Sequence, residues 1–368
     1  MRVQTLGLAA AIAGLFSSPV FAEAYTVVKL ATLGGIYTYG TGINSAGQIT
    51  GYSATTGNWA DRAYITSADG ASVTDLGTLG GVSSVGVGIN DVGQVVGYST
   101  QLRSSNGHAF VTGPNGAGMT DLGTFGGTSS HAYAINGSGQ VVGWADTVTA
   151  VHAFITGPNG VTLTDLGTLG GSGSYSIAMA VNESGQVAGY SENADARRHA
   201  FVTGANGSGM TDLGTLGGSY SYAYGINDSG WVVGEAYTQG NQAVRAFISG
   251  ANGAAMLDLG ALGGSFSAAR DINNSGNVVG HAYTAGNLEQ HAFVTGTNGL
   301  GMTDINSLVS LSPGVYLRDA YGINDAGQII ATGSDGQAYF LSPVPEPGSY
   351  ALLLAGIAIV GAKVRRKS

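Results

Sequence analysis

Residues 210–234 read MTDLGTLGGSYSYAYGINDSGWVVG, and close copies of this stretch recur along the chain about every 46 residues. Each copy contains isoleucine, or valine in one copy, followed by asparagine. These asparagines lie 45, 46 or 51 residues apart, at Asn44, Asn90, Asn136, Asn182, Asn227, Asn273 and Asn324. A repeat of about 40 to 50 residues is typical of propellers and solenoids, in which all copies together form one domain.

Each copy contains four short segments that are rich in β-branched and aromatic residues and separated by glycines. The first segment ends in Ile-Asn, the second contains Val-Val-Gly, the third contains Ala-Phe-Val-Thr or a relative, and the fourth is Thr-Asp-Leu-Gly-Thr-Leu. Such segments predict strands, and an Asn-Gly pair after the third segment predicts a hairpin turn. Helical periodicity is absent outside the two ends of the chain.

Four short strands make a small antiparallel sheet that cannot bury both of its faces alone. If such sheets stack radially around an axis, each sheet covers the faces of its neighbours. Residues such as Ile135, Val141, Phe154 and Leu166 of one sheet then pack against the same set in the next. The sequence therefore predicts an all-β fold, a seven-bladed β-propeller of four-stranded antiparallel blades. An open β-solenoid is the alternative.

The order of the strands favours a closed ring. A strand of the fourth type comes first, at residues 25–33, whereas the seventh copy stops after its third strand near Phe340. We therefore predict that the N-terminal strand completes the last blade and removes an exposed sheet edge.

Composition narrows the classes of function. The 64 glycines indicate many tight turns. Residues 24–342 contain 20 acidic and 8 basic residues, a balance that repels phosphate backbones and argues against nucleic-acid binding. The chain has no cysteine, which excludes disulfides, thiolate metal sites and thiol nucleophiles.

The two ends differ from the repeats. Arg2, an apolar run and small residues before Glu23 predict a signal peptide at residues 1–22, so the propeller occupies residues 24–342. A Pro-rich linker follows at 343–347, and residues 348–368 form an apolar segment with a basic end. We expect a C-terminal apolar helix there, a sorting or transmembrane segment. Its uncharged part, 348–362, reaches about 22 Å as a helix, which is shorter than the hydrocarbon core of a membrane.

Two resemblances follow from these motifs. The His-Ala-Phe triplets resemble the HAF extracellular-repeat family, and they occur at His108, His152, His199 and His291. Pro345, Glu346 and Pro347, the apolar segment and the Arg-Arg-Lys end are similar to a PEP-CTERM sorting signal. Together these resemblances imply a Gram-negative surface or extracellular-matrix protein without enzymatic activity. They also imply that an exosortase-type enzyme processes the tail, in organisms that make exopolysaccharide.

Residues repeated once per unit are poor candidates for a metal or cofactor site, and we expect neither. A metal needs several converging ligands, whereas the histidines of the His-Ala-Phe triplets occur once per copy at one strand position. The aspartates of the fourth strands, such as Asp165 and Asp212, are expected to make turn or inter-strand hydrogen bonds. The acids in the Asn-x-x-Gly turns offer too few oxygens for calcium.

One repeat position changes its character along the chain. Eight residues after the key asparagines lie four aromatic residues and then polar ones: Tyr52, Tyr98, Trp144, Tyr190, Glu235, His281 and Thr332. Flat aromatic faces suit sugar rings, so the four aromatic residues are predicted ligand-binding residues. Ordinary blade packing is the alternative.

Catalytic motifs are absent: there is no Gly-x-Ser-x-Gly elbow, no His-Glu-x-x-His and no phosphate loop. The sequence therefore predicts no catalytic residue. It favours a non-enzymatic exported protein of the cell envelope or matrix, whose partner is exopolysaccharide or a surface protein. A polysaccharide-active enzyme that uses the propeller funnel and a purely structural surface-layer protein are the alternatives.

Overall fold

The computed structural model describes residues 24–171 and 173–344, which form 28 strands and nine 3-10 helices of three residues each. None of the described helices is long and apolar enough to cross a membrane. The expected signal peptide and C-terminal helix lie outside the described residues, as does the Pro-Glu-Pro motif.

Each repeat unit contributes strands of the four predicted types. The first strands are β2 (Gly34–Ile43), β6 (Gly80–Ile89), β10 (Ser130–Ile135), β14 (Ser176–Val181), β18 (Gly217–Ile226), β22 (Gly263–Ile272) and β26 (Leu317–Ile323). The second strands are β3 (Ile49–Thr55), β7 (Val95–Gln101), β11 (Val141–Asp146), β15 (Val187–Glu192), β19 (Val232–Thr238), β23 (Val278–Thr284) and β27 (Ile329–Gly333).

The third strands have six residues each, and five of the seven fourth strands have three. The third strands are β4 (Asp61–Thr66), β8 (Gly107–Thr112), β12 (Val151–Thr156), β16 (Arg198–Thr203), β20 (Val244–Ser249), β24 (Gln290–Thr295) and β28 (Ala338–Pro343). The fourth strands are β5 (Val73–Asp75), β9 (Met119–Gly123), β13 (Leu163–Asp165), β17 (Met210–Asp212), β21 (Met256–Asp258), β25 (Met302–Asp304) and, from the other end of the chain, β1 (Tyr25–Lys29).

The 3-10 helices lie in the connections between strands. They are η1 (Thr56–Asn58), η2 (Pro114–Gly116), η3 (Pro158–Gly160), η4 (Ala205–Gly207), η5 (Gln239–Asn241), η6 (Ala251–Gly253), η7 (Ala285–Asn287), η8 (Thr297–Gly299) and η9 (Ile305–Ser307). Five of the turns with an Asn-Gly pair hold that asparagine at positive φ, as Asn159 does at 57°. Asparagine adopts this left-handed region more readily than most residues, which explains its place in the turn.

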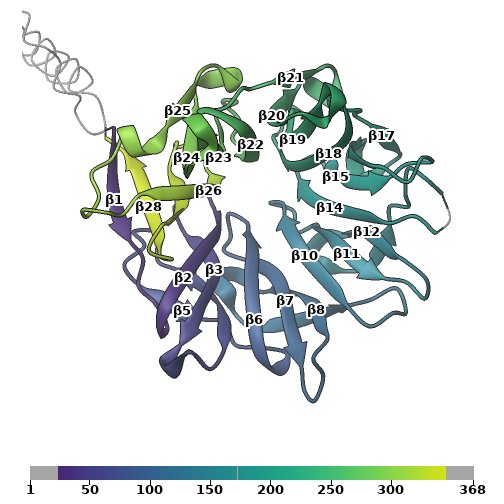
Figure 1. Ribbon diagram of the computed structural model, residues 1–368. Coiled ribbons are helices and arrows are strands. Elements are labelled where there is room, and N and C mark those ends of the chain that lie inside the picture. The colour runs from purple at the N-terminus through teal and green to yellow at the C-terminus, as the bar shows by residue number, and fades with distance from the viewer. Residues whose placement is uncertain (1–23, 172, 345–368) are drawn as a thin grey trace, which may run out of the picture.

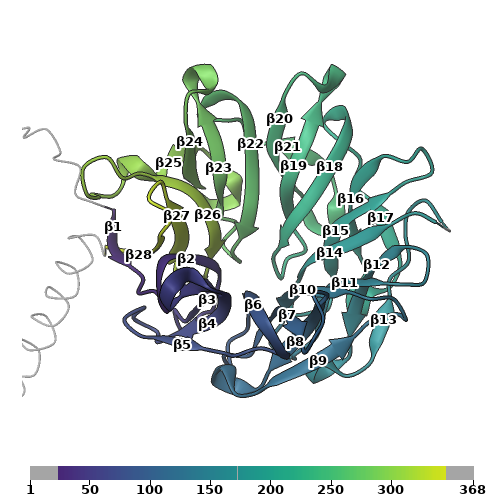
Figure 2. The same cartoon turned by 60° about the horizontal axis from the view of Figure 1, so that its bottom comes forward.

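The sheets stand around a central opening, with the first strands innermost (Figures 1 and 2). The prediction of seven four-stranded blades is wrong. The described strands form five separate four-stranded antiparallel sheets, and the strands of two neighbouring repeats, β18–β21 and β22–β25, share one eight-stranded sheet. A parallel pairing of Val244 with Phe266 joins these two repeats. A repeat pattern fixes the number of units, but it does not say whether the backbones of two neighbouring units come close enough to pair.

The N-terminal strand closes the ring, as predicted. β1 pairs antiparallel with β28 over five residue pairs, from Tyr25 with Pro343 to Lys29 with Tyr339. Leu30, next to β1, is buried in a cluster with Ile330 and Phe340. The chain is therefore not the open solenoid that was the alternative.

The core lies between adjacent units. The aromatic residue of each third strand, such as Phe154 and Phe201, is fully buried in six units. Ile135, Val141 and Phe154 share one cluster with Val96 of the preceding unit, whereas Leu166 packs in the next cluster along. Each unit therefore buries its apolar residues against its neighbours, as the sheet-stacking argument requires.

Candidate functional site

A ring of asparagine side chains surrounds the central axis. The side-chain amide of each key asparagine donates to the backbone carbonyl of the key asparagine in the next unit, at 3.0 to 3.2 Å. The last of these bonds, from Asn324 to Asn44, connects the two ends of the repeat region. This ring explains why the Ile-Asn pair recurs in every copy.

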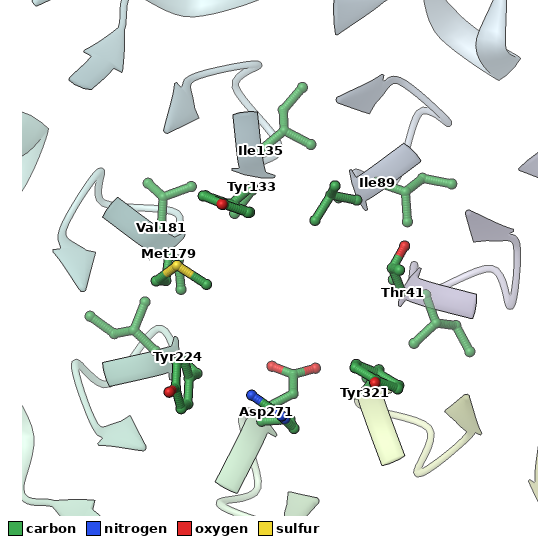
Figure 3. Close-up of a pocket in the computed structure, with 18 residues that line it drawn as sticks. Thr41, Ile89, Tyr133, Ile135, Met179, Val181, Tyr224, Asp271 and Tyr321 are labelled. Carbon is green, nitrogen blue, oxygen red and sulfur yellow. The ribbon is translucent and has the colours of Figure 1, made fainter. Parts of the chain in front are cut away.

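A β-bulge in each first strand builds the wall of the central channel. The pairing with the second strand skips one residue near the end of the first strand, for example Tyr224 between Ala223 and Gly225. The bulged residues line a cavity of about 370 Å³, and they are Thr41, Val87, Tyr133, Met179, Tyr224, Arg270 and Tyr321. Figure 3 shows several of these side chains around the opening. Bulges redirect side chains in this way, often beside functional sites.

Small residues next to the bulges allow the first strands to pack closely. A side chain at Gly88 would begin only 2.8 Å from the carbonyl oxygen of Tyr133 in the next unit. Six units have glycine or alanine at this position, whereas the unit of β22 has Asp271. The Asp271 carboxylate accepts hydrogen bonds from the backbone N–H groups of Ile272 at 2.8 Å and Ile323 at 2.9 Å. Asp271 also lines the channel (Figure 3), and burial raises the pKa of its carboxyl to about 6.

The raised pKa of Asp271 predicts a pH-dependent stability. The folded chain holds this proton up to about pH 6 but the unfolded chain only up to about pH 4, so the free energy of unfolding falls as the pH rises between these values. At about 1.4 kcal/mol per pKa unit, the loss is at most about 3 kcal/mol. We expect Asp271→Ala, which copies Ala134 and Ala180 of other units, to remove this loss. Urea titrations of both proteins from pH 4 to pH 7 measure this loss. If the two unfolding free energies differed by the same amount at every pH, the raised pKa of Asp271 would be contradicted.

A second cavity, of about 350 Å³, adjoins the first at the asparagine ring, since five of the residues that end the first strands line both: Ile43, Ile89, Ile135, Val181 and Ile226. The turn residues after the asparagines border it, and they include Asp91, Glu183, Asp228 and Asp325. Their carboxylates accept backbone N–H groups of the preceding unit, as Asp91 does from Ser45 at 2.9 Å and Glu183 from Gly137 at 2.8 Å. These acids therefore connect adjacent units.

The four predicted ligand-binding residues lie on second strands and line neither cavity. Each packs half-buried against an aromatic residue of a first strand. Tyr52 stacks on Tyr39 with ring centres 5.0 Å apart, and Tyr98 stacks on His131 of the next unit at 3.8 Å.

The other two aromatic residues pack in the same manner. The Trp144 indole N–H donates to the hydroxyl of Tyr133 at 3.2 Å, and Tyr190 meets Tyr222 of the next unit edge to face at 5.0 Å. The four side chains therefore form a layer behind the first strands. Through Tyr133, Trp144 supports a residue of the channel wall. Their role in ligand binding remains a prediction.

The polar members of the same repeat position lie beside Arg270. The Arg270 guanidinium packs over the ring of Tyr224, with Cζ 5.1 Å from the ring centre, and its Nε lies 3.6 Å from Oδ2 of Asp319. Asp319 Oδ1 lies 3.0 Å from Nδ1 of His281. The pKa of the neighbouring Glu235 carboxyl is raised by burial, which outweighs the opposing effect of the Arg270 charge. Thr332 of β27 pairs with Asp319 of β26. We call Glu235, Arg270, His281, Asp319 and Thr332 the polar cluster, of which Arg270 lines the first cavity and the other four line neither cavity.

The histidines of the His-Ala-Phe triplets bind the aspartates of the fourth strands. Nδ1 of His152 lies 2.7 Å from a carboxylate oxygen of Asp165, and the other oxygen of Asp165 accepts the backbone N–H of Gly167 at 2.7 Å. The same pair occurs at His108, His199 and His291. These contacts match the inter-strand role predicted for the aspartates. Residues 24–171 and 173–344 contain no group of three or more His, Cys, Asp or Glu side chains that could hold a metal ion.

The sequence interpretation missed the bulged residues that line the channel. They stand three residues before each key asparagine, and this position varies from threonine to tyrosine to arginine, while its neighbours are glycine or alanine in every unit except at Asp271. Such a variable position within a constant repeat is the signal that could have located the wall.

Sheets arranged around a channel and closed by the N-terminal strand define a β-propeller. Residues 343–367 match the family model described as the PEP-CTERM protein-sorting motif. This motif marks a bacterial protein for export to the cell envelope or the extracellular space, and exosortase sorts such proteins. A comparison with curated proteins finds none that matches the chain.

Solved structures share the fold at low sequence identity. Oligogalacturonate lyase from Vibrio parahaemolyticus is 11% identical with a TM-score of 0.57, and the match covers 87% of this chain and 94% of the lyase. A catalytically inactive virginiamycin B lyase from Staphylococcus aureus, in complex with quinupristin, is 10% identical with a TM-score of 0.55, covering 87% and 100%. The β-propeller domain of the Trilobed protease from Pyrococcus furiosus is 6% identical with a TM-score of 0.51, covering 83% and 93%. At these identities the likeness concerns the fold alone.

Proposed function

We propose that this chain is a non-enzymatic, exported β-propeller that binds a glycan at its central channel. The observation that supports this proposal best is the channel wall, where bulges bring Tyr133, Tyr224, Tyr321 and Arg270 into one cavity of about 370 Å³. Ligand pockets commonly combine aromatic surfaces with a few polar groups, in volumes of about 300–1,000 Å³. Tyrosine rings offer sugars an apolar face and a hydroxyl.

The proposal extends to the place where the protein acts. The His-Ala-Phe triplets support membership of the HAF extracellular-repeat family, and the sorting motif supports a position at the outer surface or in the matrix of a Gram-negative bacterium. Exosortase then processes the tail near Pro345, Glu346 and Pro347. The mass of the mature C-terminus, measured on material recovered from the cell surface, checks this step, and an intact Ser368 would contradict it.

Glycan binding is tested by replacing the tryptophan behind the channel wall. We expect Trp144→Ala to weaken glycan binding about tenfold, a loss of about 1.4 kcal/mol, because it withdraws the indole that holds Tyr133. Binding of the mature protein to a glycan array, followed by calorimetry on the best glycan, measures the effect. The matched control is Trp59→Ala, since Trp59 is largely exposed and lines neither cavity. No binding by the unchanged protein to any polysaccharide would refute the glycan proposal.

A second candidate function is a polysaccharide-active enzyme at the same channel. The raised pKa of Glu235, close to a second carboxylate at Asp319, is the observation that favours it, because general acids in glycan cleavage need a carboxyl that keeps its proton. Incubation with the host's own exopolysaccharide discriminates the two candidates. Robust shortening of the polymer by the purified protein would replace the non-enzymatic proposal.

A further inference from the structure

Arg270 is the one cationic side chain among the described residues that line the channel cavity. It occupies the bulge of β22, and its Cζ lies 5.1 Å and 5.8 Å from the ring centres of Tyr224 and Tyr321. Asp319 holds the Nε side of the guanidinium at 3.6 Å, and 29% of the Arg270 side chain remains exposed. Two rings and a carboxylate therefore fix the orientation of the planar group at the channel wall.

The guanidinium makes no hydrogen bond to any residue in the described part of the chain, and its buried Nε has no partner. Its ion-pair distance to Asp319 is too long for a hydrogen bond. Arginine presents five N–H donors in a rigid fork, so the outer donors stay open to a ligand in the channel.

Further buried polar atoms without a hydrogen-bond partner lie in the same cluster, namely Nδ1 of His281, Oδ1 of Asp319 and Oγ1 of Thr332. These residues are 5%, 5% and 8% exposed. His281 Nδ1 and Asp319 Oδ1 are 3.0 Å apart but do not form a hydrogen bond with each other. An unsatisfied buried polar group costs about 1–3 kcal/mol, so such an atom is typically completed by a ligand or an ordered water. Of these four residues, Arg270 is the one that lines the channel cavity, so a ligand in the channel meets the guanidinium first.

The charges around Arg270 decide which ligand fits. Glu235, Asp271 and Asp319 supply three carboxyl groups against Arg270 and the titratable His281, and the whole chain has a net charge of −9. A carboxylate on the ligand would add to the local acidic groups, and a cationic ligand would face Arg270. A hydroxyl group avoids both problems, because it donates to carboxylates and accepts from guanidinium.

We propose that Arg270 is the centre of a subsite for a neutral sugar residue with vicinal hydroxyls, a proposal that rests on the glycan-binding function above. The guanidinium donates to two neighbouring hydroxyl oxygens of the sugar, and the rings of Tyr224 and Tyr321 lie beside it. Figure 3 shows these two tyrosines on the channel wall. Asp319 is a positioning residue that holds Arg270. The ligand class is thus an uncharged hexose polymer rather than a polyuronate or a polymer of amino sugars.

The test is calorimetry of the mature protein with four probes. Two are neutral, β-glucan oligosaccharides and galactan oligosaccharides, and the others are the acidic oligogalacturonate and the basic chitosan oligomers. We expect binding of a neutral probe and at least tenfold weaker binding for Arg270→Gln. Arg270→Lys keeps the positive charge beside Asp319 but lacks the planar set of guanidinium donors. We therefore expect this variant to stay folded and to lose about as much affinity as Arg270→Gln. Arg245→Gln, on β20 outside both cavities, is the matched control and should change affinity less than twofold.

The outcomes separate this inference from the function on which it rests. Stronger binding of oligogalacturonate or chitosan oligomers would overturn the neutral-sugar subsite while glycan binding stands. Neutral binding that survives in folded Arg270→Lys would overturn the assignment to Arg270. Absence of binding to every probe and to the glycan array would overturn the glycan function, and the subsite with it.

Discussion

Deletion of residues 24–33 is expected to cost about 4–6 kcal/mol of unfolding free energy and to open the sheet at the far end of the chain. The deletion removes β1, which pairs with β28 over five residue pairs, and Leu30, which is 2% exposed. Loss of a buried leucine side chain alone costs about 2–5 kcal/mol, and the backbone groups of β28 lose their partners as well. Total stabilities of about 5–15 kcal/mol are typical, so the effect is large.

Hydrogen exchange locates the damage. The full chain and the deleted chain are compared at Ile329–Gly333 and Ala338–Pro343, where we expect protection to fall in the deleted chain. Lys29→Ala is the control, because the exposed Lys29 contributes an ion pair to Asp335 at 3.0 Å, and exposed pairs are worth about 0–1 kcal/mol. Unchanged protection in β28 after the deletion would show that β1 does not close the ring.

The repeat carries most of the information about the fold. Strand order and ring closure follow from the four segment types and from their offset at the two ends, and the pairing of Tyr25–Lys29 with β28 confirms that reasoning. The joining of two repeats into one eight-stranded sheet could not be predicted in the same way. It depends on a single backbone pairing of Val244 with Phe266, which a repeat pattern in the sequence does not reveal.

The channel wall was harder to predict because a bulge breaks the alternation of side chains along a strand. The change from aromatic to polar residues at one repeat position favoured second-strand residues such as Trp144, which lines neither cavity. Tyr133, Tyr224 and Arg270 point into the channel because each is the extra residue of a bulge. The change from aromatic to polar residues along the chain did mark the polar cluster, since Glu235, His281 and Thr332 all belong to it.

The asparagine ring gives the second large expected effect. Asn182 is buried, and its amide donates to Gln186 Oε1 at 2.9 Å and to the Asn227 carbonyl at 3.1 Å. Its own side-chain oxygen accepts the backbone N–H of Gln186 at 2.9 Å and two bonds from Ser184. Asn182→Ala leaves these groups without a partner at about 1–3 kcal/mol for each fully buried one, so we expect a loss of about 3–5 kcal/mol.

Urea unfolding midpoints measure this loss, and a residue of the same type in the same repeat provides the control. Asn193 also accepts two backbone N–H groups, from Asp195 and Arg197, but in an exposed turn where water can replace it. Asn193→Ala is therefore expected to cost less than about 1 kcal/mol. Asn182→Asp keeps the shape but loses both donors and places a carboxylate against the Asn227 carbonyl, so it should destabilise as much as Asn182→Ala. If Asn182→Ala and Asn193→Ala had equal effects, the ring would not be what holds adjacent units together around the channel.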